Sequence, residues 1–118
     1  MMQGSLKGAA GLQAAQQQIE ALMSSFEVRE FSAISQGVSV VLTGDMVMKS
    51  LSSSNELVST ADVTAAYAQA MTELVHERNT NFVRIRNAVQ KKFRIDIKDT
   101  IPEVNAAIEY FNARQKAG

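Results

Sequence analysis

The apolar residues between Ala61 and Ile95 recur three and four positions apart, which is typical of a helix with one buried stripe. The stripe consists of Tyr67, Met71, Leu74, Phe82, Ile85 and Val89. Neither proline nor glycine interrupts this stretch. The pattern predicts one long helix, roughly 50 Å in length at about 1.5 Å per residue. Because a chain of 118 residues is too short to cover such a helix along its whole length, we expect its far half to meet another subunit.

Two other stretches have helical spacing. Residues 6–26 predict a first helix that becomes firm near Leu12, because Gly8 and Gly11 weaken its first turns. After a turn near Asp96, the segment 100–103 (TIPE) has the pattern of a capping box with proline in the first turn. A last helix should follow, with an apolar side formed by Ile101, Val104, Ile108 and Phe111.

Between the first and the long helix the period of the pattern changes to two, which indicates strands. Three strands are predicted, at Val28–Ile34, Val38–Thr43 and Met46–Leu51. Gly37 and Gly44 mark the turns between them, so the strands form an antiparallel meander. The predicted fold is therefore α+β with the order α-β-β-β-α-α. Without a linker or an internal repeat, residues 1–118 are expected to form a single domain.

The net charge is zero, but the charged residues are unevenly distributed. Residues 1–77 contain three basic and eight acidic side chains, whereas residues 78–98 contain seven basic and one acidic. We call six of these residues the basic cluster: Arg84, Arg86, Lys91, Lys92, Arg94 and Lys98. Arg84, Lys91 and Arg94 are spaced to share one face of the predicted helix.

The basic cluster has three possible interpretations. Aligned cations bind the phosphates of duplex DNA by releasing the counterions that surround it. Alternatively, the cluster is a solvated face, or it pairs with acidic residues such as Glu73 and Glu77 of a second subunit. No aromatic residues are interleaved with the cations to stack single-stranded bases, and no residue suggests the reading of base edges.

Arg78 lies within the apolar stripe of the long helix. It could set the register of a dimer by pairing with an acidic residue of the partner. Alternatively, its stem packs in the stripe while its charged end reaches water, or the helix bends at this point.

Residues suited to catalysis or metal binding are scarce. Cysteine is absent, His76 is the only histidine, and the carboxylates show no paired arrangement. We therefore expect neither an enzyme nor a cofactor or metal site. No apolar run approaches the 18 residues of a membrane span, and the absence of cysteine fits a cytoplasmic location.

The first half of the chain resembles a known family. The segments LQAAQQQIEALMSSFEV, QGVSVVLTGDMVMKSL and ADVTAAYAQAMTELVHE are similar to the YbaB/EbfC family of bacterial nucleoid-associated proteins over roughly residues 10–80. The resemblance implies a homodimer with joined sheets and projecting helical arms. It also implies binding of duplex DNA with little sequence preference, and a location on the nucleoid. Two departures are the single lysine of the first helix, Lys7, and a divergent C-terminal extension at about 96–118.

Two functions are predicted for the chain. The first is a homodimer that binds duplex DNA through the basic cluster, and the second is a dimeric protein-interaction or scaffold module without DNA binding. The dimer interface is expected to contain Val38, Val40, Leu42, Leu74, Arg78 and Phe82.

Overall fold

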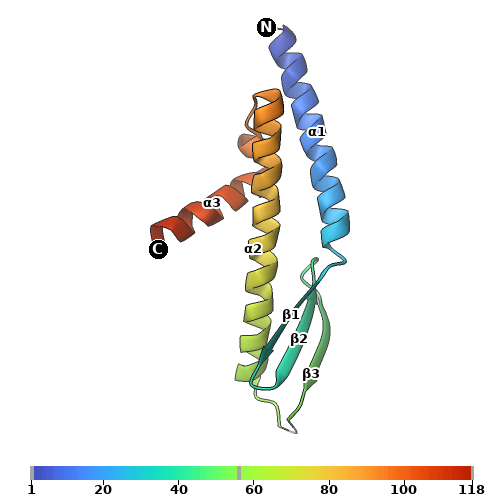
Figure 1. Ribbon diagram of the computed structural model, residues 1–118, viewed down its shortest axis with the longest axis vertical. Coiled ribbons are helices and arrows are strands. Elements are labelled where there is room, and N and C mark those ends of the chain that lie inside the picture. Colours follow the sequence, from blue (N-terminus) through green and yellow to red (C-terminus); the bar gives the residue numbers. More distant parts are fainter. Residues whose placement is uncertain (1, 56, 118) are drawn as a thin grey trace. The chain divides into compact units, whose positions relative to one another are not determined.

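A computed structural model describes residues 2–55 and 57–117 of the chain (Figure 1). The elements are α1 (Met2–Phe26), β1 (Glu30–Ser35), β2 (Val38–Thr43), β3 (Met48–Ser53), α2 (Thr60–Phe93), the 3-10 helix η1 (Ile97–Asp99) and α3 (Pro102–Ala117). The predicted α+β class and the order of helices and strands are confirmed.

The chain divides into two compact units. The sheet unit comprises residues 23–77, and the helical unit comprises residues 1–22 and 78–118. Helices α1 and α2 each contribute residues to both units. Residues 96–118, which were predicted to be a C-terminal extension, belong to the helical unit together with the start of α1. That the two units act as a single domain stays a prediction.

The sheet unit is an antiparallel meander in the order β1-β2-β3. On β2 the side chains of Val38, Val40 and Leu42 are buried and alternate with half-buried residues, as the period of two predicts. Their face of the sheet is covered by the first half of α2, where Ala66 and Leu74 are also fully buried (Figure 1).

Two strands begin later than predicted, because turns occupy their expected first residues. Val28 lies in the turn that ends α1, where the Arg29 N–H donates to Phe26 O at 3.0 Å. Met46 lies in the β2–β3 turn with a φ of 68°, and its N–H donates to Thr43 O at 2.8 Å. The hairpin turn is therefore longer than the pair Gly44-Asp45 suggests.

Gly44 stands where the hairpin meets the end of α1. Its N–H donates to Arg29 O at 2.9 Å. A Cβ atom at this position would lie 1.8 Å from the backbone oxygen of Phe26. Only glycine allows this approach, so the hairpin and the end of α1 depend on each other.

The helical unit has its own apolar core. Its buried side chains are Ala15, Phe82, Val89, Ile97, Ile101, Val104 and Ala107. Gly11 of α1 is buried against Phe93 and Ile95, because a Cβ atom there would lie 2.7 to 3.0 Å from their side-chain atoms. The early part of α1 and the end of α2 therefore pack directly together within this unit.

Helix α2 is continuous through residues 78–81, four poor helix formers at which the sequence permits a break. Its start is capped by Ser59, whose hydroxyl accepts the Asp62 N–H at 3.1 Å. Its 34 residues correspond to about 50 Å, the length predicted from the sequence. The apolar stripe is confirmed at Leu74, Phe82 and Val89, which are all buried.

Candidate nucleic-acid interface

The last turns of α2 carry exposed cations and no carboxylate of their own. Residues 78–95 contain no aspartate or glutamate. Within the basic cluster, four side chains belong to exposed residues: Arg84, Lys91, Lys92 and Arg94. The buried side of the same helix holds Phe82 and Val89. Burial of the apolar stripe therefore turns these cations toward solvent.

The geometry of Arg94 ends the helix. Arg94 has a φ of 61°, in the left-handed region, and its N–H donates to Gln90 O at 2.9 Å. This is a C-terminal capping arrangement that usually contains glycine, and a residue with a Cβ atom adopts it at a cost of roughly 1 kcal/mol. The backbone on either side of Arg94 is anchored because Phe93 and Ile95 pack on Gly11.

A shallow hollow of about 480 Å³ opens on the end of α2. It is lined by Asn87, Gln90, Lys91 and Arg94. All four residues are exposed; Asn87, Gln90 and Lys91 lie on one face of the helix, and Arg94 follows directly after its last residue, Phe93. The hollow combines two cations with two neutral amides, so it offers several hydrogen-bond donors to one ligand.

Arg86 is paired with an acidic residue of its own chain. Its Nε lies 3.1 Å from Asp96 Oδ1, and its Nη2 lies 2.7 Å from Asp96 Oδ2. This two-point pairing is the strongest geometry between guanidinium and carboxylate. Hydrogen bonds from Arg86 lower the pKa of Asp96, with a smaller opposite effect of burial and a further lowering by the Lys98 N–H. The pKa of Arg86 is raised by the same hydrogen bonds.

The remaining Arg86 nitrogen also has a partner, since Nη1 donates to Asn87 Oδ1 at 3.0 Å. All three guanidinium nitrogens therefore have a partner within the chain, and the charge of Arg86 is largely balanced by Asp96. Lys98 is half-buried on η1, and its N–H donates to Asp96 Oδ1 at 3.1 Å. Lys92 lies over the ring of Phe93, with its Nζ 5.4 Å from the ring centroid.

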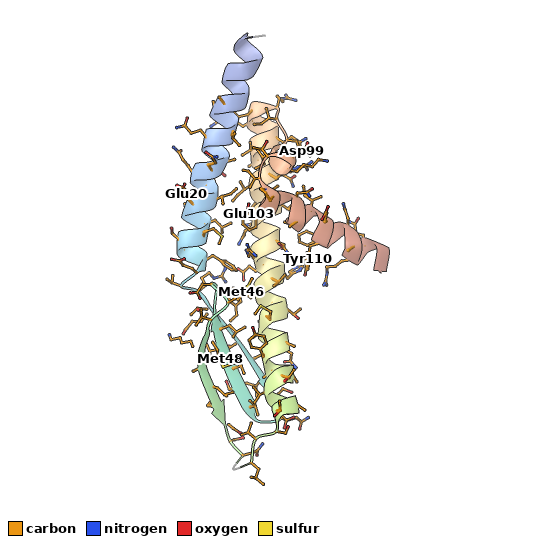
Figure 2. All side chains as sticks on the ribbon, turned by 180° about the vertical axis from the view of Figure 1, so that it is seen from behind. Glu20, Met46, Met48, Asp99, Glu103 and Tyr110 are labelled. Atoms are coloured by element: carbon orange, nitrogen blue, oxygen red, sulfur yellow. The ribbon has the colours of Figure 1, made fainter. Side chains whose placement is uncertain are left out.

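Exposed carboxylates occur beyond the helix end. Figure 2 shows Asp99 on η1 and Glu103 in the first turn of α3. Residues 84–99 nevertheless contain six basic and only two acidic side chains, and Asp96 is one of the two. The surface at the end of α2 therefore keeps a positive balance.

The residues predicted for the dimer interface are mostly inside the single chain. Val38, Val40, Leu42, Leu74 and Phe82 are at most 1% exposed. A side chain that is buried in its own chain cannot contact a second copy directly. These five residues could therefore affect a dimer interface only by packing behind the residues that form it. The dimer itself stays a prediction.

Arg78 packs within its own chain. Its guanidinium carbon lies 5.3 Å from the centroid of the Phe82 ring. Glu77, the acidic residue next to it in the chain, forms an ion pair with Arg29. The ring contact is the arrangement expected if the stem of Arg78 packs in the apolar stripe.

Another exposed surface lies on the sheet unit. Eight large apolar residues are exposed there: Val28, Ile34, Met46, Val47, Met48, Leu51, Leu57 and Val58. Met48 and Leu51 of β3 pair with Leu42 and Val40, so their side chains belong to the face that α2 covers over β2. They are nevertheless 40% and 49% exposed. Figure 2 shows Met48 together with Met46 at the hairpin.

The sequence located the exposed cations but did not assign roles to Asn87, Gln90 or Asp96. Asn87 is four residues before Lys91 and lies on the same exposed face of α2. The pair Arg86–Asp96 spans ten residues around the end of a helix, so the spacing rules for a continuous helix do not reveal it.

In residues 2–55 and 57–117, no group of histidine, cysteine, aspartate and glutamate side chains could hold a metal ion. Within the same residues, none of the helices has the length and apolarity to cross a membrane.

No protein-family model matches the chain, and no curated protein matches it. The resemblance to the YbaB/EbfC family therefore rests on the quoted segments of sequence and stays an interpretation.

Proposed function

We propose that this protein is a homodimer that binds duplex DNA, with little dependence on base sequence, through the exposed cations at the end of α2. The observation that carries the proposal is the exposure of Arg84, Lys91, Lys92 and Arg94 within the segment 78–95, which contains no carboxylate. Each cation that contacts a phosphate releases counterions from the DNA, and this release stabilises the complex irrespective of sequence.

The proposal predicts how affinity depends on salt. Four phosphate contacts give a slope of about −3.6 in log K against log salt for each protomer that contacts the duplex, at about −0.9 per contact. Between about 50 and 200 mM salt, this slope corresponds to a loss of affinity on the order of 100-fold. Two duplexes of unrelated sequence should behave alike.

A charge reversal with a matched control tests the site. The double variant Lys91→Glu/Arg94→Glu should lose at least about 50-fold in affinity for a duplex of about 30 base pairs, measured by fluorescence anisotropy. The control Lys49→Glu/Arg114→Glu changes the net charge by the same amount at exposed residues outside the hollow. It should bind DNA nearly as well as the parent. Equal losses in both variants would show that net charge, and not this surface, governs binding.

The second candidate function is a protein-interaction module, favoured by the apolar side chains of β3. One helix about 10 Å wide covers little more than two strands spaced about 4.8 Å apart, so the third strand remains uncovered. Met48 and Leu51 together with the unpaired edge of β3 then offer a surface for a second copy or for another protein.

This candidate is tested on a single strand. Leu51→Glu places a charge on the uncovered apolar face, whereas Ser52→Glu places it on the opposite face of β3. Light scattering after size exclusion should show a dimer for the parent and for Ser52→Glu, and a monomer for Leu51→Glu. If both variants are dimers like the parent, this face is not the dimer interface. If all three proteins also bind DNA, DNA binding does not depend on this face.

A further inference from the structure

A chain of contacts connects a half-buried carboxylate to the surface of α2. Asp96 binds two nitrogens of Arg86, at 3.1 and 2.7 Å, and the third nitrogen of Arg86 donates to Asn87 Oδ1 at 3.0 Å. The Asp96 side chain also accepts the Lys98 N–H at 3.1 Å and thereby caps the N-terminus of η1. Arg86 therefore fixes the side chain of Asn87, and Asp96 fixes Arg86.

Chemistry determines which way the Asn87 amide points. A guanidinium group has only donors, so the atom that faces it must be the amide oxygen and not the amide nitrogen. With Oδ1 bound to Arg86, the other end of the amide is a hydrogen-bond donor. Asn87 also lines the hollow, together with two cations, Lys91 and Arg94.

We propose that the hollow binds one phosphate group of the DNA backbone, with Asn87 as an uncharged donor that Arg86 and Asp96 hold in place. This inference rests on the proposed function and assigns its central contact. Lys91 and Arg94 supply the positive charge, and Asn87 supplies a hydrogen bond in a set direction. Arg86 and Asp96 are positioning residues that do not touch the DNA.

The polarity of the hollow favours a phosphate over a base edge. An asparagine that reads adenine uses its oxygen as an acceptor and its nitrogen as a donor at the same time. The oxygen of Asn87 already accepts from Arg86. A donor beside two cations instead matches the several acceptor oxygens of a phosphate.

The test separates the hydrogen bond from the charges by means of salt. Asn87→Ala should lower affinity for duplex DNA about tenfold. Because asparagine is neutral, the salt slope should stay unchanged, and the loss should be equal for duplexes of unrelated sequence. Lys91→Ala should instead reduce the slope by about 0.9. Asn112→Ala, at an exposed asparagine of α3, is the matched control and should bind like the parent.

Two further variants test the orientation of the amide. Asn87→Asp keeps the shape and the contact with Arg86 but presents an acceptor to the phosphate, so it should bind DNA more weakly than Asn87→Ala. Asp96→Asn should lower affinity in the parent and have no further effect in Asn87→Ala, since Asp96 acts through Asn87. Circular dichroism melts establish that each variant is folded at the temperature of the binding assay.

The outcomes distinguish the two proposals. A parent protein that fails to bind any duplex at about 50 mM salt overturns the proposed function. A parent that binds while Asn87→Ala binds equally well overturns only the phosphate contact at Asn87. A loss confined to one duplex sequence also overturns it, because the contact would then be to a base.

Discussion

The two units of this protein differ in charge and in the kind of surface that they expose. The sheet unit, residues 23–77, contains seven acidic and two basic side chains, whereas the helical unit contains five acidic and ten basic. All eight large apolar residues found exposed belong to the sheet unit, among the side chains that the structure describes. An acidic unit with an apolar edge repels DNA and suits protein contacts, while the basic unit suits phosphates. The net charge of zero conceals this division.

The sheet unit should be the easier one to break. Gly44→Ala would bring a Cβ atom to 1.8 Å from Phe26 O, a backbone atom that cannot move away without distorting the end of α1. We expect a loss of about 4 kcal/mol or more in the free energy of unfolding, measured by urea denaturation.

Gly8→Ala is the control for this prediction, because no atom lies within 4 Å of the added Cβ. Alanine is the better helix former, so this variant should be stabilised by about 0.5 to 1 kcal/mol. If Gly44→Ala unfolds at the same urea concentration as the parent, the hairpin does not pack as closely on the end of α1 as described.

The helical unit should show a smaller effect of the same kind. Gly11→Ala would place a Cβ atom 2.7 Å from Ile95 Cδ1, which can shift, and 2.8 Å from Phe93 Cβ, which moves only with the end of α2. We expect a loss of about 1 to 3 kcal/mol in urea denaturation. A loss as large as that of Gly44→Ala would mean that the end of α2 is as rigid as the hairpin.

The Arg86–Asp96 pair makes the helical unit sensitive to acid. The folded-state pKa of Asp96 lies below its ordinary value, chiefly because Arg86 donates hydrogen bonds to it. The stabilisation is therefore complete above the unfolded pKa of about 3.9 and is lost as pH falls through the lower folded value. Since the pair is about a quarter exposed, we expect about 1 kcal/mol, seen as a fall in the free energy of unfolding below about pH 4.

Asp96→Asn cannot titrate at this position, so its stability should depend less on pH over the same range than that of the parent. Identical pH profiles for the two proteins would contradict the assignment of the effect to Asp96.

Arg94 should show the smallest effect on stability, with the opposite sign. Arg94→Gly removes the cost of a left-handed backbone at a residue with a side chain, and should raise the free energy of unfolding by about 0.5 to 1 kcal/mol. The same variant removes one cation and should reduce the salt slope of DNA binding by about 0.9. If Arg94→Gly is more stable but binds DNA like the parent, Arg94 is not part of the proposed DNA-binding site.

Much of the fold was predictable because local patterns encode it. The spacing of Leu74, Phe82 and Val89 requires a helix with one buried side, and the alternation at Val38, Val40 and Leu42 requires a strand. The strand starts were displaced because hydrogen bonds of turns, at Arg29 and Met46, do not follow from apolar spacing. The exposure of Arg84 and Lys91 was predictable for the same reason as the stripe, since their spacing places both on a side of α2 away from it.

The sequence by itself therefore determined the elements, their order and the concentration of positive charge late in α2, since each depends on neighbours within one or two turns. Only the tertiary structure decided which of these charged side chains pair within the chain and which stay exposed. The turn after Phe93 returns Asp96 to Arg86, which takes this arginine out of the exposed set and orients Asn87. It also decided that one helix covers β2 and leaves Met48 and Leu51 uncovered. Such contacts join residues that are distant along the chain or separated by turns, and the periodicity of a single segment carries no information about them.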